Sequence, residues 1–277
     1  MRHPGLAMRM LVAGSILFAF YLLVAIAMML GGIPLELVIL ITLGFVGFQW
    51  KFGKWAALRS VGARDVSEDE YPYLHQSVES LSRRMDVPKP RVMVAEMGAP
   101  NAFAIGRRNK GTVVVATELM QILDRQELDG VLAHELAHIR NRDVVMMVLG
   151  QSIASLVGIV VTYAMIFGGR RNLGAYFLAW IAGSLAQMLV MVFVLAISRY
   201  REYVADADAA EAIGTGDPLA RALEKIQRSN ERVDQTRIDD NTAALCIFDS
   251  PHGLLRSIFS THPPTEKRIE RLRYGAY

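Results

Sequence analysis

Cysteine is nearly absent from this chain, and its scarcity excludes a disulfide framework. Cys246 is the single cysteine among 277 residues, so no disulfide can form within one chain. Disulfides persist in oxidising compartments, so this composition fits a reducing one.

The chain is also poor in charge, with 21% charged against 52% hydrophobic residues and a mean hydropathy of +0.27. This balance is too apolar for an ordinary soluble domain and predicts an integral membrane protein.

Features typical of nucleic-acid and phosphate binding are missing as well. The formal net charge is +3, but no basic patch with interleaved aromatic residues occurs, so we expect no nucleic-acid partner. The turn from Gly106 to Gly111 superficially resembles a P-loop. No lysine follows Gly111, however, and phosphate binding is not expected. Scattered Lys and Arg in so apolar a chain are better explained by membrane topology.

Four apolar runs are candidates for membrane spans, each of about the length that a bilayer crossing needs. They cover Met10–Leu30, Leu35–Trp50, Val144–Phe167 and Ala175–Ile197. Short turns separate the members of each pair, so the pattern predicts two transmembrane hairpins. A cleaved signal peptide is the alternative for the first run, although residues 25–27 make a poor cleavage site.

The motif that carries chemistry is His134-Glu135-Leu136-Ala137-His138, inside a helix-patterned run. Positions i and i+4 of a helix lie on one face, so both imidazoles can turn toward one Zn²⁺ with Glu135 beside it. The alternative is a solvated helix face that carries the motif by chance. Catalytic zinc uses three protein ligands and keeps a fourth position for water, so a third ligand decides between the two.

The third ligand is predicted downstream of the motif. The metzincin pattern requires Gly at position 141 and His at 144, where this chain has Asn141 and Val144. The other solution is a glutamate from a later helix, and Glu202 fits it in an E-x-x-x-D arrangement with Asp206. A metal-bound histidine usually donates its second N–H to a carboxylate, the role we expect for Asp206. The sequence therefore predicts one Zn²⁺ per chain, bound by His134, His138 and Glu202.

This ligand set constrains the topology. One zinc ion cannot be ligated from two sides of a bilayer, so hairpins at 1–50 and 144–197 leave a catalytic domain in two parts, 51–143 and 198–277, on one side. Arg170 and Arg171 lie on the opposite side and leave open whether the second hairpin crosses completely. The positive-inside rule then places the catalytic domain and both termini in the cytoplasm, at the cell membrane. Nine positive residues flank the spans on the catalytic side: Arg2, Arg9, Lys51, Lys54, Arg59, Arg140, Arg142, Arg199 and Arg201.

A small sheet is expected beside the zinc helix. Arg91–Glu96 and Thr112–Thr117 are short, valine-rich strands, joined through residues 101–105 and the 106–111 turn. An exposed edge of this sheet would pair with an extended substrate backbone and present the scissile peptide to the metal.

Helices surround this sheet in the prediction. One has Leu74, Val78, Leu81 and Met85 on its buried face, and one that begins near Asp217 has Leu219, Leu223 and Ile226. A capping box over 124–127 begins the zinc helix. Because apolar residues follow Asp143 at once, we expect this helix to continue into the third span. His138 and Val144 would then lie about 9 Å apart along the helix axis.

Four motifs carry a family resemblance: HELAHIRNRD, SRYREYVAD after an apolar hairpin, Pro100–Ala104, and the closing THPPTEKRI. Together they resemble the HtpX family of membrane-embedded zinc metalloproteases, relatives of the CAAX prenyl proteases. The resemblance implies an α+β gluzincin domain in an α-helical membrane protein, with Glu135 as the catalytic residue. It also implies that His262 and Arg268 approach the active site and that Asn101 lies on the substrate-binding edge. From the residues alone, His262 before a proline is a turn residue.

The expected activity is zinc-dependent hydrolysis of peptide bonds. Zinc would lower the pKa of water and polarise the carbonyl, Glu135 would act as general base, and His262 would stabilise the oxyanion. The family implies misfolded or damaged membrane proteins as substrates, self-cleavage included. The alternatives are a prenyl-protein endopeptidase, which needs an enclosed chamber, and a zinc-binding membrane scaffold, which would tolerate loss of Glu135.

Overall fold

The computed structural model of this chain describes residues 35–168, 172–232 and 262–275, together with Ser15, Ala19 and Ile26. The predicted first span, Met10–Leu30, lies outside the continuous described residues, as do Arg170 and Arg171. The chain divides into two compact units. We call Met1–Gly53 with Met146–Ile197 the helical unit, and Lys54–Val145 with Ser198–Tyr277 the α+β unit.

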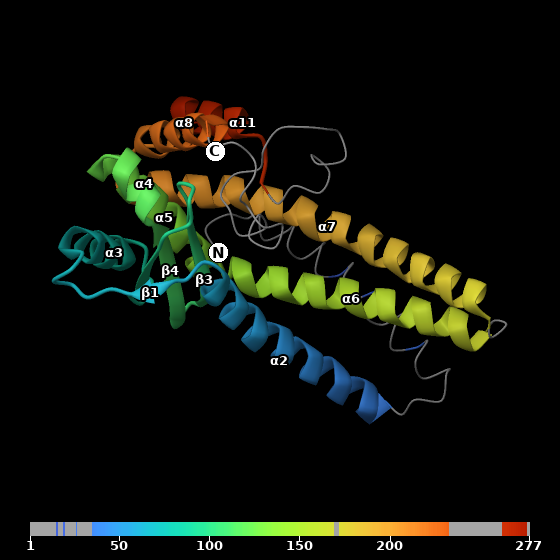
Figure 1. Cartoon of the computed structure of the whole chain (residues 1–277). Helices are drawn as coiled ribbons and strands as arrows, with labels where there is room; N and C mark the ends of the chain where they lie inside the picture. Colours follow the sequence, from blue (N-terminus) through green and yellow to red (C-terminus); the bar gives the residue numbers. More distant parts are fainter. Residues whose placement is uncertain are drawn as a thin grey trace. The chain divides into compact units, whose positions relative to one another are not determined.

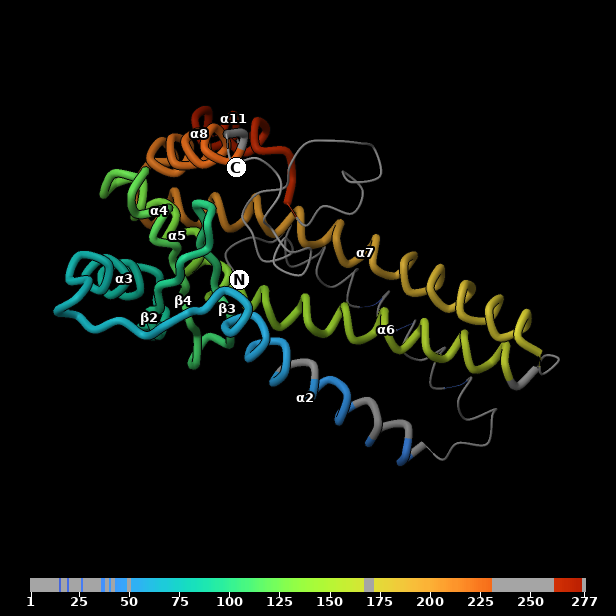
Figure 2. The backbone as a smooth tube through the Cα atoms, in the orientation of Figure 1, coloured from blue at the N-terminus to red at the C-terminus, as the bar shows by residue number. Residues whose placement is uncertain are grey.

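The α+β unit contains a four-stranded mixed sheet with strand order β1-β2-β4-β3. Its strands are β1 (Arg64–Asp65), β2 (Arg91–Ala95), β3 (Ala102–Arg107) and β4 (Lys110–Ala116). The strands β2 and β4 are parallel, from Arg91 opposite Thr112 to Ala95 opposite Ala116. The two strands expected from the sequence are therefore confirmed, and the trace in Figure 2 shows them next to each other.

The segment expected only to join those strands is itself a strand, which corrects the prediction. It is β3, antiparallel to β4 from Ala102 opposite Val115 to Arg107 opposite Lys110. Its alanines and glycine have low strand propensity, so the pairing with β4 is what makes this segment extended. Gly106 has φ +105°, and a Cβ at this position would collide with the Lys110 carbonyl oxygen, so only glycine fits the hairpin here.

Among the described residues, five helices lie wholly in the α+β unit, which also contains the end of α2, the start of α6 and the end of α7. They are α3 (Pro72–Arg84), α4 (Thr117–Ile122), α5 (Arg125–Asn141), α8 (Asp217–Arg232) and α11 (Thr265–Tyr274). The helix α5 is central because it packs against β3, α3 and α8, and α8 in turn packs against α11 (Figure 1). The predicted apolar faces are confirmed, since each of these side chains is at most 4% exposed: Leu74, Val78, Leu81, Met85, Leu219, Leu223 and Ile226.

The start of α5 also follows the sequence prediction. Glu127 N–H donates to Asp124 Oδ1 at 2.9 Å, and Asp124 N–H donates to Glu127 Oε2 at 2.9 Å, which is a complete capping box. Its end does not follow the prediction. Arg142 adopts a left-handed conformation (φ 59°, ψ 35°), so α5 ends at Asn141 and α6 (Asp143–Gly168) begins afresh. The expected continuous helix into the third span is therefore wrong, because a left-handed residue interrupts the helical backbone.

A close approach between α5 and α8 yields a testable prediction about stability. A Cβ at Gly130 would lie 2.9 Å from the Leu219 backbone nitrogen, a distance that backbone atoms cannot relieve without shifting. We expect Gly130→Ala to lower the free energy of unfolding by about 1–3 kcal/mol, measured by thermal unfolding in detergent. In the control Gly53→Ala, no atom lies within 4 Å of the added Cβ, and we expect no loss. Equal unfolding of both variants would contradict the close packing.

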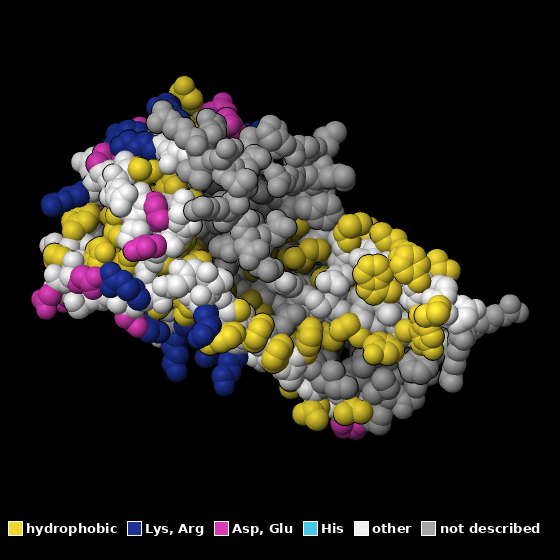
Figure 3. All heavy atoms as spheres, viewed as in Figure 1, with side chains coloured by type: hydrophobic (Ala, Val, Ile, Leu, Met, Phe, Trp, Pro, Cys, Tyr) yellow, Lys and Arg dark blue, Asp and Glu magenta, His cyan; other side chains and the backbone are white. Residues whose placement is uncertain are grey.

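The helical unit is formed by most of α2 (Leu35–Ser60), α6 and α7 (Leu173–Ile213). In the described part of the chain, the segments Asp143–Ile166 and Leu173–Ile213 are long and apolar enough to cross a membrane. Only 33% and 22% of their most apolar windows are buried, whereas the core helix of a soluble protein is mostly buried. Hydrophobic side chains instead gather on the surface of this unit, as Figure 3 shows.

Two of the four predicted spans thus coincide with apolar helices, and the number of spans stays a prediction. The second predicted span, Leu35–Trp50, is helical within α2, and its crossing of a membrane stays a prediction. Within the unit α6 and α7 pack closely, since a Cβ on Gly183 would collide with the Gly158 carbonyl oxygen. Small residues at such crossings are typical of helices packed in a membrane.

Candidate metal centre

Two helices of the α+β unit bring together three side chains that could bind a metal ion. His134 and His138 come from α5, and Glu202 comes from α7. Their ring nitrogens face each other, with 3.1 Å between His134 Nε2 and His138 Nε2. Glu202 closes the group, with Oε1 at 3.3 Å from His138 Nε2 and Oε2 at 3.5 Å from His134 Nε2. The three residues predicted as ligands therefore converge on one point.

These distances are compatible with a group that holds a metal ion. Zinc bonds to histidine nitrogen and carboxylate oxygen are about 2.0–2.2 Å long, so ligand atoms at the corners of a tetrahedron lie about 3.3–3.6 Å apart. The nitrogens lie 3.1 Å apart, and each has an oxygen of Glu202 at 3.3 or 3.5 Å, a different oxygen for each histidine. Two nitrogens and one oxygen are also a donor set that zinc accepts. The residues present thus fit the metal that the H-E-x-x-H motif implies.

Each histidine has a carboxylate on the side opposite this point. His134 Nδ1 lies 3.0 Å from Asp206 Oδ1, the contact expected from the E-x-x-x-D spacing. His138 Nδ1 lies 2.6 Å from Asp143 Oδ2, which the sequence analysis did not anticipate. Such contacts hold an imidazole in one tautomer with Nε2 directed at a metal. The signal in the sequence for Asp143 is its place as an acidic residue directly before the apolar run from Val144.

The terminal motif reaches the same centre. Arg268 on α11 is 1% exposed and donates to both Asp206 oxygens, from Nε at 2.8 Å and from Nη2 at 2.7 Å. Its Nη1 lies 3.2 Å from Glu202 Oε2, and His262 Nδ1 lies 2.9 Å from the same oxygen. The expectation that Arg268 binds substrate stays a prediction. Its burial and its contacts favour instead a role in orienting Asp206 and Glu202.

Asn101, expected on the substrate edge, immediately precedes β3. It is 4% exposed, and its carbonyl oxygen accepts a hydrogen bond from Ala116 N–H at 2.8 Å. This bond extends the pairing of β3 with β4 by one residue. Among the described strands β3 pairs only with β4, and it packs against α5, the helix that carries the histidines. Its residues 102–106 are buried, so the expected exposed edge is not seen in the free protein.

The charged side chains of the centre are buried, so each of them needs an opposite charge nearby to be stable. Four carboxylates around the histidines face two guanidinium groups, which leaves an excess of two negative charges if the imidazoles are neutral. All six side chains are at most 6% exposed: Glu135, Asp143, Glu202, Asp206, Arg201 and Arg268. Buried charges are stable only when they are paired, so a divalent cation between the histidines would balance the centre.

The pKa shifts on α5 agree with this excess of negative charge. Burial raises the pKa of the Glu135 carboxyl, Glu202 raises it further, and the two imidazoles oppose the rise. Burial by itself lowers the pKa of His134, but hydrogen bonds to Asp206 and Glu202 outweigh it and raise that pKa. The pKa of His138 is raised in the same way, chiefly by Glu202 against burial. The site therefore favours a positive charge at the point where the two rings meet.

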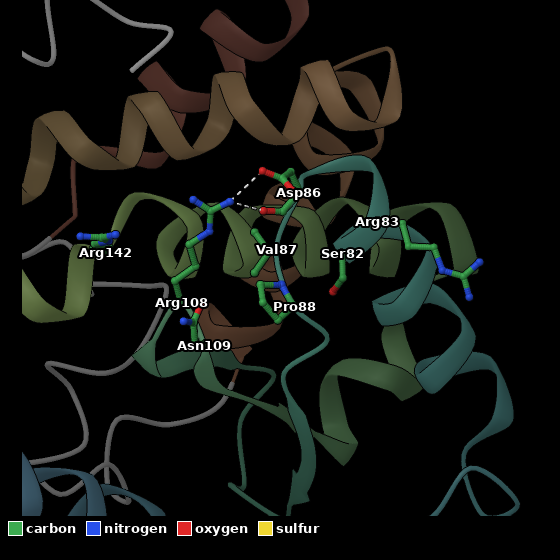
Figure 4. Close-up of a pocket in the computed structure, with 8 residues that line it drawn as sticks. All are labelled: Ser82, Arg83, Asp86, Val87, Pro88, Arg108, Asn109 and Arg142. Carbon is green, nitrogen blue, oxygen red and sulfur yellow. Dashed lines mark hydrogen bonds and ion pairs between the residues drawn. The ribbon is translucent and has the colours of Figure 1, made fainter.

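A pocket of about 530 Å³ lies elsewhere in the α+β unit and contains none of the predicted site residues. Its lining, drawn in Figure 4, consists of Ser82, Arg83, Asp86, Val87, Pro88, Arg108, Asn109 and Arg142. Arg108 donates to the Asp86 carboxylate at 2.8 Å across it. Arg142 thus belongs to this pocket, whereas the next residue, Asp143, contacts His138.

Comparison with known proteins gives consistent matches. The family model described as Peptidase family M48 matches residues 68–276. A Protease HtpX homolog of Halobacterium salinarum is 53% identical over 288 aligned residues, covering 95% of this chain and 100% of that protein. A Protease HtpX homolog of Aquifex aeolicus is 41% identical over 266 residues, covering 91% and 87%.

A solved structure has the same fold. The crystal structure of S. mikatae Ste24p matches with a TM-score of 0.61 at 19% identity, over 97% of this chain and 64% of that chain. At this identity the likeness concerns the fold alone. The family model spans both helices that carry the histidines and the glutamate, and relatives of one name match along nearly the whole chain. This chain therefore belongs to peptidase family M48 and is a membrane metalloprotease of the HtpX family.

Proposed function

We propose that this protein is a zinc endopeptidase that hydrolyses peptide bonds of misfolded or damaged membrane proteins on the cytoplasmic side. The observation that carries the proposal is the convergence of His134, His138 and Glu202, whose ligand atoms lie within 4.8 Å of one another. A set of two imidazoles and one carboxylate leaves a fourth position for water, as catalytic zinc requires. The excess of two buried negative charges supports a divalent ion.

The side chains of the centre divide the chemistry among them. A bound zinc ion would supply a Lewis acid that polarises the scissile carbonyl and acidifies water. Glu135, next to His134 on α5, takes the proton of the attacking water and later passes it to the leaving amine. Its burial favours this role, because a raised pKa helps the carboxyl hold a proton during the reaction.

The residues of the terminal motif complete the assignment. His262 is held by its Nδ1 contact with Glu202, and we assign its Nε2 to the oxyanion that develops on the substrate carbonyl. Arg268 pairs with Asp206 and thereby keeps that carboxylate on His134. This assignment makes His262 a catalytic residue and Arg268 a positioning residue.

The edge strand β3 is the proposed platform for the substrate. An extended peptide that adds to β3 would be bound through backbone hydrogen bonds, with little dependence on its side chains. That mode suits a protease acting on unfolded segments of many proteins. The contact between β3 and α5 and the position of Asn101 directly before β3 support it.

The topology that we propose has two membrane hairpins, 1–50 and 144–197, and a cytoplasmic catalytic domain made of 51–143 and 198–277. The apolar α6 and α7 support the second hairpin. The excess of Lys and Arg on the catalytic side supports the orientation. The names of the relatives support proteolysis, and the choice of damaged membrane proteins, this chain included, rests on the family resemblance. The prenyl-protein alternative receives no support beyond a shared fold.

Removal of the third ligand tests the zinc site. We expect the detergent-purified wild type to hold one zinc ion and to cleave an unfolded protein such as casein. We expect Glu202→Ala to lose the ion and at least about 100-fold in cleavage rate, since two histidines alone hold zinc poorly. Zinc is measured by atomic absorption, and a chelator should inactivate the wild type reversibly. Retention of stoichiometric zinc by Glu202→Ala would exclude Glu202 as a ligand.

A further inference from the structure

The break between α5 and α6 decides which side chain lies behind His138. On an uninterrupted helix, the residue five positions after His138 would be rotated by about 140° away from it. The left-handed conformation of Arg142 removes this constraint. It directs consecutive residues to different places, with Arg142 in the lining of the pocket in Figure 4 and Asp143 against His138 Nδ1 at 2.6 Å. The left-handed conformation of Arg142 is unfavourable for a residue with a side chain, and it allows the contact between Asp143 and His138.

A single guanidinium group stabilises both sides of this break. Arg201 pairs through Nη2 with the Asp143 carboxylate. Its Nη1 donates to the Asp143 carbonyl oxygen at 3.2 Å, and its Nη2 donates to the Asn141 carbonyl oxygen at 3.4 Å. Arg201 is 2% exposed and Asp143 is 6% exposed, so water does not replace these bonds. Because Arg201 immediately precedes Glu202, the same contact ties the last turn of α5 to the backbone that carries the third ligand.

We propose that Asp143 and Arg201 form a positioning pair for the metal centre. Asp143 accepts a hydrogen bond from His138 Nδ1–H. This bond fixes the tautomer in which Nε2 carries no proton and is directed at the ion. Arg201 holds the Asp143 side chain in place, and it sets the distance between His138 and Glu202. The pair performs for His138 what Asp206 and Arg268 perform for His134. This inference rests on the proposed zinc site and adds residues that act through its ligands.

The test compares two carboxylates at the same junction. Asp143→Asn removes the charge behind His138 but keeps the side-chain volume. Asp208→Asn is the matched control, because Asp208 is 2% exposed, accepts a hydrogen bond from Asn141 at 2.7 Å and pairs with Arg140. We expect zinc affinity, measured by competition with a chelator, to fall about 10–100-fold for Asp143→Asn and to stay at the wild-type value for Asp208→Asn. The visible absorption spectrum of the Co²⁺-loaded protein should change in Asp143→Asn alone.

A second variant keeps the test decisive if Asp143→Asn does not fold. Arg201→Lys retains the charge but has no planar fork to reach Asp143 and the Asn141 carbonyl together. We expect it to fold, to bind zinc several-fold more weakly than the wild type and to shift the Co²⁺ spectrum. Wild-type affinity and spectrum in whichever of these variants folds would overturn the positioning pair. If the wild type itself binds no stoichiometric zinc, the proposed function fails instead, so the two failures are distinguishable.

Discussion

Replacement of Glu135 by glutamine is expected to abolish nearly all turnover while the protein keeps its zinc. The amide cannot accept the proton of the attacking water, and general-base catalysis contributes about 10²–10⁴-fold to a rate. Glu135 is absent from the group of converging ligand atoms, so the metal should remain bound. The measurement is the rate of casein cleavage per zinc-loaded molecule, with zinc content determined on the same sample.

The control for this prediction is a second buried glutamate on the same helix. Glu127 is 1% exposed, closes the capping box of α5 and pairs with Lys225 at 2.6 Å. Glutamine also serves at this position of a capping box, so Glu127→Gln should fold and cleave at close to the wild-type rate. Wild-type cleavage by Glu135→Gln would refute the assignment of Glu135 as the base and favour the scaffold alternative.

Replacement of Arg268 by alanine should produce the largest loss of stability. Arg268 neutralises Asp206 with two hydrogen bonds and approaches Glu202, all three being at most 4% exposed. Removal of one partner of a buried ion pair leaves an uncompensated charge, which costs about 3–5 kcal/mol. We therefore expect a markedly lower midpoint of thermal unfolding in detergent, together with weaker zinc binding because Asp206 no longer holds His134.

A surface arginine on the same helix provides the comparison. Arg273 is 42% exposed and pairs with Glu224 at 2.8 Å, and a surface pair of this kind contributes about 0–1 kcal/mol. Arg273→Ala should unfold near the wild-type temperature. If Arg268→Ala unfolds at the same temperature as Arg273→Ala, the buried pair does not stabilise the fold. The substrate-binding role implied by the family resemblance then becomes the better explanation for Arg268.

Local patterns account for the parts of the fold that were predicted well. The capping box at Asp124 and Glu127 and the apolar faces of α3 and α8 depend on residues three or four apart, so the sequence displays them directly. The zinc motif is of the same kind, because helical spacing alone puts His134 and His138 on one face. Glu202 required one further step, the exclusion of a third histidine at position 144.

Predictions that depended on distant parts of the chain were less successful. The strand β3 was mistaken for a connection, since its alanines favour a strand only when β4 pairs with them. The break at Arg142 was missed because arginine carries no signal for a left-handed conformation. Without that break, the sequence does not place Asp143 behind His138. For Arg201 the sequence indicates only a positive charge beside a predicted membrane span.

The identity of the donor atoms, the spacing of the two histidines and the apolar runs follow from the order of residues alone. They depend on side-chain chemistry and on helical geometry over a few residues. The tertiary structure decided how far Glu202 lies from the histidines and which carboxylate stands behind each ring. It also buried Arg268 against Asp206, 62 residues away in the chain. Such contacts join helices that pack only when the whole unit folds, because a buried charge is stable only when an opposite charge or a metal ion neutralises it.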